Sequence, residues 1–136
     1  MDQKIKTFKF IHLAMVAGVT LAYFFLGDFK NIFNLEIDNS DLPYSFIPAI
    51  AYVFGNILFR NTLKKIDRDN TPDEKLAIYQ TASIMRWAVL EGACFAILFL
   101  KPKLLLFGVI LLVYMILIAP RKSQILQTLG IKNSEI

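Results

Sequence analysis

The sequence lacks most of the residues that enzymes and metal sites use. In 136 residues it has one cysteine, Cys94, and one histidine, His12, which excludes a disulfide framework and a zinc site built from these two residue types. It also lacks the patterns of phosphate-binding loops, dinucleotide-binding turns, zinc-peptidase helices and nucleophile elbows. We therefore expect a protein without enzyme activity, cofactor or bound metal.

Charged residues are also scarce, at 19% of the chain, whereas hydrophobic residues make up 56% and include 12 Phe. Because a disordered chain needs low hydrophobicity and high net charge, this composition excludes disorder. The net charge of +4 comes from short clusters of Lys and Arg beside the apolar stretches. We interpret these clusters as topology signals and lipid-headgroup contacts, and we expect no nucleic-acid partner.

Four long apolar stretches hold most of the hydrophobic residues. A helix of about 20 residues crosses the roughly 30 Å hydrocarbon core of a bilayer. The fourth stretch has no polar face, and a chain of 136 residues is too small to bury four such helices from water. The sequence therefore predicts one all-α domain, an integral membrane four-helix bundle with spans at about 8–26, 44–62, 76–100 and 104–120. No small-x-small cleavage site follows the first stretch, so we expect it to remain as a helix.

The third span is predicted to begin outside the membrane. Thr71, Pro72 and Glu74 have the spacing of a capping box, with a hydroxyl at the cap, proline at the first helical position and glutamate three residues after the cap. A helix over 72–100 is about 43 Å long at 1.5 Å per residue, which exceeds the thickness of the hydrocarbon core. We therefore expect its first turns to stand in water.

Lys and Arg are distributed unevenly between the two sides of the predicted bundle. Only Lys30, Lys101 and Lys103 flank the side that carries the acidic connection 27–43. Because positive residues are retained in the cytoplasm, both termini are predicted to be cytoplasmic, in a multi-pass protein of the inner or plasma membrane. The eleven residues on the cytoplasmic side are Lys4, Lys6, Lys9, Arg60, Lys64, Lys65, Arg68, Lys75, Arg121, Lys122 and Lys132.

A weak internal repeat relates the first and third spans. When residues 14–22 are aligned with residues 88–96, both segments show the pattern Ala-x-x-x-Gly-x-x-x-Ala. Small residues four apart share one helix face and let two backbones approach closely in lipid, so we predict that the two spans touch through these faces. Two interpretations of the similarity remain: two parallel helical-hairpin repeats, or chance in an apolar sequence. The residues concerned are Ala14, Gly18, Ala22, Ala88, Gly92 and Ala96.

Glu91 is the first candidate for a functional residue inside the predicted spans. It lies nine residues before the outer end of the third span. At 1.5 Å per residue it is about 13 Å deep, close to the midplane of the membrane. Because an isolated carboxylate is costly there, we predict that Glu91 forms a hydrogen bond with Tyr114, Tyr52 or Thr20.

A second polar layer is predicted nearer the cytoplasm. Arg86 and His12 fall at matching depth in the repeat alignment, and Asn56 approaches from the second span. Arg86 and Glu91 are five residues apart, about 140° around the helix, so we expect no direct ion pair between them. The complete candidate site is Glu91, Arg86, His12, Asn56, Tyr114 and Tyr52.

Two functions from different classes are compatible with this sequence. The first is a non-catalytic accessory, assembly or oligomer-forming subunit, whose partners are the lipid bilayer and either further copies of itself or a larger membrane complex. The second is a proton- or ion-coupled transporter or channel component in which Glu91 is the titrating group. A lipid-modifying enzyme has only the acids in 67–74 as candidates, and these alternate with basic residues as in a solvated connection.

Overall fold

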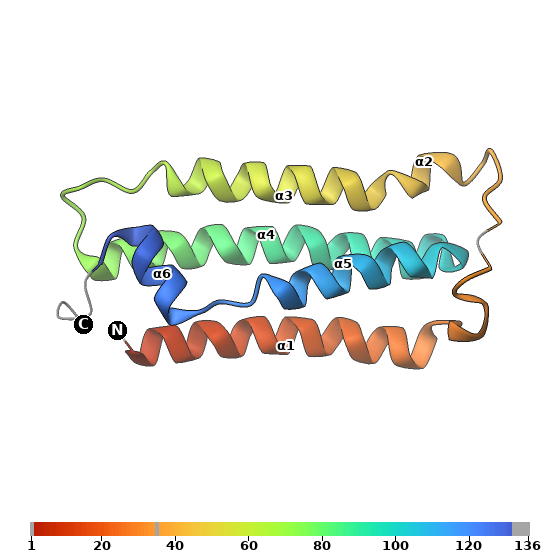
Figure 1. The fold of residues 1–136 in the computed structure, drawn as a ribbon, viewed down its shortest axis with the longest axis horizontal. Coiled ribbons are helices and arrows are strands. Elements are labelled where there is room, and N and C mark those ends of the chain that lie inside the picture. Colours follow the sequence, from red (N-terminus) through yellow and green to blue (C-terminus); the bar gives the residue numbers. More distant parts are fainter. Residues whose placement is uncertain (1, 35, 132–136) are drawn as a thin grey trace.

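The computed structural model describes residues 2–34 and 36–131, in which every regular element is a helix. Lys132, which we used for the orientation, lies outside the described residues. Four long helices lie side by side along the molecule (Figure 1): α1 (Asp2–Leu26), α3 (Ile47–Leu63), α4 (Pro72–Leu100) and α5 (Leu105–Leu117). The shorter elements are η1 (Phe29–Asn31), α2 (Leu42–Ser45), η2 (Pro102–Leu104) and α6 (Lys122–Leu129). The predicted all-α class is confirmed.

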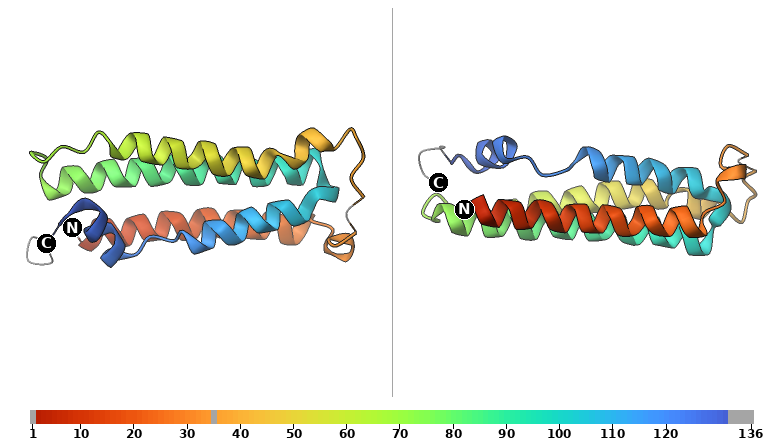
Figure 2. Two further views of the ribbon diagram at one scale, coloured as in Figure 1. Left: turned by 45° about the horizontal axis from the view of Figure 1, so that its top comes forward. Right: turned by 90° about the horizontal axis from the view of Figure 1, so that it is seen from below.

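Helix α4 is the central element of the bundle, because it packs against α1, α3 and α5. Seen from another side, α3 and α4 form one pair and α1 and α5 form the other (Figure 2). The chain reverses direction at each connection, so both described ends lie at one end of the bundle. There the Lys122 ammonium lies 2.8 Å from the Asp2 carboxylate and links the start of α6 to the start of α1. The location of this end in the cytoplasm stays a prediction.

The start of α4 confirms the capping box. The Thr71 hydroxyl accepts a hydrogen bond from the Glu74 backbone N–H at 3.2 Å, and the Glu74 carboxylate accepts one from the Thr71 N–H at 2.9 Å. Two of the N–H groups that every helix start leaves without an intrahelical partner are thereby satisfied. This cap fixes where the longest helix of the bundle begins.

The second span is continuous apart from one residue, whereas the fourth is interrupted. Helices α2 and α3 together form one apolar stretch over Leu42–Leu63, which contains the predicted span 44–62. Helix α5, in contrast, ends at Leu117, and the chain bends by 74° into α6. Pro120 lacks an N–H group and disfavours a helical conformation at the preceding residue, which explains the break. The helix therefore ends three residues before the end of the predicted span, about 104–120.

Helix α6 crosses over the first half of α4. Its apolar residues Ile125, Leu126 and Leu129 are buried, whereas the residues between them are exposed. Among the described residues only Gly130 has a positive φ, 68°, and it ends α6 in the left-handed conformation that glycine favours. Three helices are long and apolar enough to cross a membrane, and the bent pair α5–α6 makes a fourth if it counts as one span. No finding tests the hairpin duplication, which stays a hypothesis.

Aromatic residues form the centre of the core, between α1 and α4. Trp87 of α4 is 1% exposed, and its ring stacks on Phe8 of α1 with 4.9 Å between centroids. The edge of the His12 ring meets Trp87 at 4.7 Å. These large rings set the distance between α1 and α4. The core continues toward the other end of the bundle through Tyr23 of α1 and Ile97 of α4, both buried.

Candidate functional site

Four of the six predicted polar residues meet in one cluster between α3, α4 and α5. The Asn56 side chain is its centre: its amide N–H group donates to the Tyr114 hydroxyl at 3.1 Å and to the Tyr52 carbonyl at 2.8 Å. The Asn56 carbonyl oxygen accepts a hydrogen bond from Arg86 at 3.4 Å. The rings of Tyr52 and Tyr114 lie 5.1 Å apart. Asn56 thus connects three helices through one side chain.

Arg86 is directed from α4 toward α3. Its guanidinium carbon lies 3.9 Å from the centroid of the Phe59 ring, the geometry of a cation–π contact. Gly55 of α3 lies beside it, and a Cβ at that position would be 3.4 Å from the Arg86 Cγ, an ordinary van der Waals contact. Among the described residues no carboxylate contacts the guanidinium, and its buried Nε has no hydrogen-bond partner. Arg86 is therefore held by an aromatic face and an amide, without a counter-ion.

His12 of α1 contacts Trp87, the residue that follows Arg86 in α4. Arg86 itself is directed toward α3, so the side chains of His12 and Arg86 do not contact each other. The His12 Nε2 instead lies 2.8 Å from the backbone oxygen of Met115 in α5. In a continuous helix this carbonyl would accept from the Ala119 N–H, but at the end of α5 that N–H donates to the Ile116 carbonyl instead. Since a carbonyl only accepts, Nε2 must carry the hydrogen. His12 therefore acts as a cap for the end of α5.

Glu91 does not form the predicted hydrogen bond. The Tyr114 hydroxyl bonds Asn56, and the Thr20 hydroxyl donates to the Val16 carbonyl at 2.7 Å. Among the described residues none forms a hydrogen bond or ion pair with the Glu91 carboxylate. Because Glu91 is about 140° around the helix from Arg86, it is turned away from the polar cluster, toward the partly exposed side of α4.

The small residues do not form the predicted contact between α1 and α4. Gly18, Gly92, Ala14 and Ala88 are exposed, and a Cβ built at either glycine has no neighbour within 4 Å. Helices α1 and α4 do touch, but through the large side chains of the core. Gly18 and Gly92 therefore face away from the contact between α1 and α4. Ala22 and Ala96, at the end of the two patterns, are partly buried.

Sequence reasoning missed a buried contact between α1, α4 and α5. The Tyr23 hydroxyl donates to the Cys94 carbonyl at 2.6 Å, and the Cys94 thiol lies 3.7 Å from the Gly108 carbonyl oxygen. The Tyr23 ring occupies the space where Gly108 lacks a side chain, since a Cβ there would lie 2.8 Å from the Tyr23 Cζ. A single glycine in the otherwise bulky fourth span was the only signal of this contact in the sequence.

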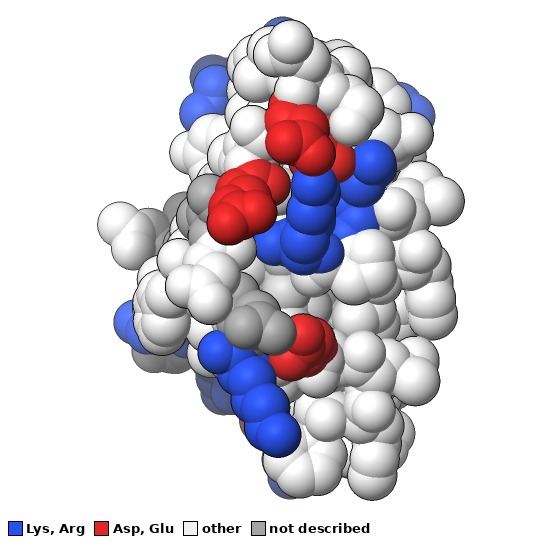
Figure 3. Space-filling view, turned by 90° about the vertical axis from the view of Figure 1, so that its right-hand side faces the viewer, with Lys and Arg blue, Asp and Glu red and all other residues white. Residues whose placement is uncertain are grey.

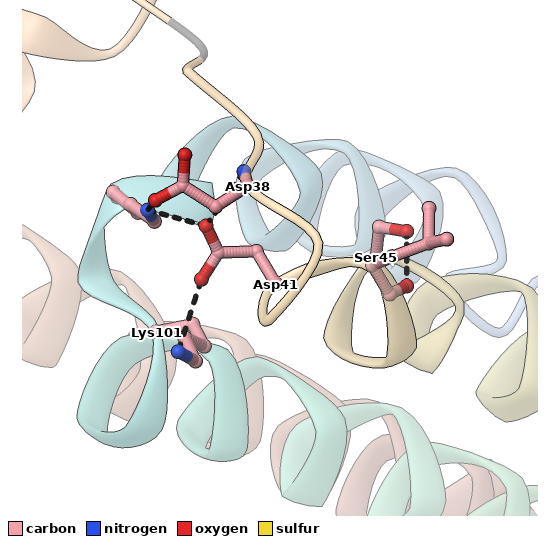
Figure 4. A network of polar contacts seen from close by, with 6 residues as sticks. Asp38, Asp41, Ser45 and Lys101 are labelled. Carbon is pink, nitrogen blue, oxygen red and sulfur yellow. Dashed lines mark hydrogen bonds and ion pairs between the residues drawn. The ribbon is translucent and has the colours of Figure 1, made fainter.

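An ionic clamp at the opposite end of the bundle from the chain termini was also missed. Asp41, in the loop before α2, is fully buried and lies 3.0 Å from the Lys101 ammonium. Lys103 pairs with the same carboxylate and, at 3.3 Å, with Asp38 (Figure 4). Acidic and basic side chains gather on this end of the molecule (Figure 3). From the sequence alone we interpret these lysines only as topology signals, although an acidic loop facing a Lys-Pro-Lys turn is a signal for pairing.

The ionic clamp fastens the loop between α1 and α3 to the turn between α4 and α5. The Asp38 backbone N–H donates to the Asp41 carboxylate at 3.1 Å and adds to the ion pairs. Hydrogen bonds from Lys103 and Lys101 hold the pKa of Asp41 far below its ordinary range. Asp41 is therefore an ionised structural residue at neutral pH.

Substituting Asp41→Asn is expected to release this loop. Because two ammonium groups lose their shared negative charge, we expect the amides of 38–45 to exchange with solvent about tenfold faster or more. The ionised carboxylate contributes stability above its unfolded-state pKa, about 3.9, and loses it only as pH falls through the lower folded-state pKa. Exchange in the native protein should therefore stay slow down to about pH 4. Asp38→Asn is the control, since that side chain is 75% exposed and should change exchange much less.

Among the described residues no group of three or more His, Cys, Asp or Glu side chains could hold a metal ion. The protein was also compared with known protein families, curated proteins and solved structures. None of these comparisons finds a match for the chain. Any functional conclusion therefore rests on the geometry described above.

Proposed function

We propose that the protein is a multi-pass protein of the inner or plasma membrane that acts without catalysis, as an accessory or assembly subunit of a membrane complex. One observation carries the proposal: Glu91, a carboxylic acid, lies partly exposed and without a partner among the described residues, on a bundle that exposes many large apolar side chains. A polar group in such a position is costly in lipid unless another molecule supplies its partner.

The apolar outer surface supports the membrane part of the proposal. Monomeric soluble proteins rarely expose contiguous apolar patches of more than a few hundred Å². Here large apolar side chains with 48% or more of their surface exposed follow all four long helices. We call this surface the apolar belt: Phe10, Leu13, Leu21, Phe24, Phe25, Ile50, Val53, Phe54, Ile57, Phe99, Ile110, Val113 and Ile116.

A transport role for Glu91 has less support. A proton path needs a chain of polar groups that connects the titrating acid with both sides of the membrane. Glu91 is turned away from Asn56 and Arg86, the polar residues that are linked within the bundle. The arrangement therefore favours a role for Glu91 in contact with another molecule.

The size of the protein in a mild detergent tests the proposal. We expect the protein mass within the micelle, measured by light scattering, to exceed the 15.5 kDa of one chain when the protein is extracted from its native membrane. A mass of one chain at every protein concentration, with no co-purifying protein, would contradict an assembly role.

A further inference from the structure

We propose that one side of the α1–α4 pair binds a transmembrane helix of a different protein, and that this helix carries a Lys or Arg at the depth of Glu91. This inference rests on the proposed function and names its partner by chemistry. We call the surface the open face and define it by Ala14, Gly18, Ala88, Glu91 and Gly92.

The residues of the open face lie on one side of the bundle. Near the chain termini, Thr7 and Ile11 of α1 and Gln80 and Ile84 of α4 line a hollow of about 180 Å³ between the two helices. Seven residues make about two helical turns, so residues seven apart point in nearly the same direction. Ala14 follows Thr7, Gly18 follows Ile11 and Glu91 follows Ile84 by seven residues. Ala14, Gly18 and Glu91 therefore continue the side on which the hollow opens, and the exposed residues Ala88 and Gly92 lie about 60° and 100° further around α4 from Glu91.

The open face suits a helix because its small residues leave the two backbones accessible. A Cβ at Gly18 or Gly92 meets nothing within 4 Å, and Ala14 and Ala88 are exposed. In lipid, helices associate by close packing at small residues, since burial of apolar surface gives little advantage there. The apolar belt, in contrast, presents Phe, Leu, Ile and Val, which keep a neighbouring helix at a distance. A helix that docks on the bundle therefore approaches most closely at the open face.

The charge of Glu91 selects the partner. The cationic or basic side chains at neighbouring depth are engaged within the bundle: Arg86 contacts Asn56 and Phe59, and His12 bonds Met115. A second copy that docked by the same face would place Glu91 opposite Glu91 and would bring no free cation. A Lys or Arg on another helix forms a charge-assisted hydrogen bond with the carboxylate. Charge complementarity thus favours a different protein over a second copy.

Association with a designed peptide in lipid vesicles tests the inference. The probe is a synthetic Leu/Ala transmembrane helix with one central Lys, and the reference is the same helix with Leu at that position. A donor dye on Asp69→Cys and an acceptor on the peptide report binding by energy transfer. We expect the Lys peptide to bind the protein about tenfold more tightly than the Leu peptide.

Three variants connect the binding to the open face. Glu91→Gln should remove the difference between the two peptides, and Gly92→Leu should weaken binding of the Lys peptide about tenfold by keeping the helix at a distance. Val53→Leu, on the exposed surface of α3, is the matched control and should leave binding unchanged. Thermal unfolding verifies that each variant is folded, which is expected because none of these positions is in the core.

Two results would overturn the inference. Equal binding of both peptides, or a preference for Lys that persists in Glu91→Gln, would show that the carboxylate does not select the partner. Self-association of labelled copies that Gly92→Leu abolishes would identify a second copy as the occupant of the open face. Neither result removes the proposed assembly role, which fails separately if the detergent-extracted protein is always a single chain.

Discussion

Replacing Gly108 with alanine is expected to destabilise the protein by about 2–3 kcal/mol, the upper part of the range for overpacked cores. The added methyl group would lie 2.8 Å and 2.9 Å from the Cζ and Cε2 atoms of Tyr23, and closer still to the hydroxyl oxygen. Tyr23 is 1% exposed and its hydroxyl bonds the Cys94 carbonyl, so the ring has no free space into which it can move. Thermal or denaturant unfolding in detergent measures the loss.

The chain contains its own control for this substitution. Gly92→Ala changes the same residue type on a neighbouring helix, where the added Cβ meets nothing within 4 Å. Alanine has a higher helix propensity than glycine by about 1 kcal/mol, so this variant should be neutral or slightly more stable. The double variant Tyr23→Phe with Gly108→Ala should lose less unfolding free energy than the two single variants added together. Phenylalanine lacks the hydroxyl oxygen, which is the atom closest to the added methyl group. Equal stabilities of the two alanine variants would contradict the packing of Tyr23 on Gly108.

Replacing His12 with alanine is expected to cost roughly 2–4 kcal/mol, from an unsatisfied buried carbonyl and the cavity beside Trp87. The Met115 carbonyl loses the N–H that replaces its helical partner, so the end of α5 should also fray. We expect faster hydrogen exchange at Ile118 and Ala119, together with the lower unfolding free energy.

The residue next to His12 supplies the control. Leu13 is 62% exposed, and Leu13→Ala removes a side chain from the outer surface of the same helical turn. In detergent this change should stay within about 0.5 kcal/mol of the native protein. An exchange rate at Ile118 that is the same in His12→Ala and Leu13→Ala would show that His12 does not cap α5.

Signals that act within a few residues were predictable from the sequence. The capping box at Thr71 and Glu74 involves neighbouring residues only, and the structure forms it. Pro120 closes the fourth apolar stretch in the sequence, and α5 ends a few residues before it. The apolar stretches likewise indicate helices, because their composition and length are local properties.

Features that depend on the rotation of each helix about its axis were not predictable. A small-residue pattern shows which residues share a face, but it does not show which neighbour that face meets. Phe8 and Trp87 determine how α1 and α4 pack, so Gly18 and Gly92 face outward. The same rotation turns Glu91 away from the hydroxyl groups that the sequence predicts as its partners. The contact of Tyr23 with Cys94 joins residues that are 71 positions apart, so it can be seen only in the assembled bundle.

Labelling of single cysteines by a membrane-impermeant maleimide tests most directly whether lipid surrounds the apolar belt. The native Cys94 is 0% exposed and serves as the unreactive background. In intact cells Ser40→Cys should react, Asp69→Cys should react only after the membrane is opened, and Val53→Cys should react in neither state. Val53 is 53% exposed on the isolated chain, so only surrounding lipid or protein protects it. Labelling of Val53→Cys as fast as that of Ser40→Cys would contradict the account.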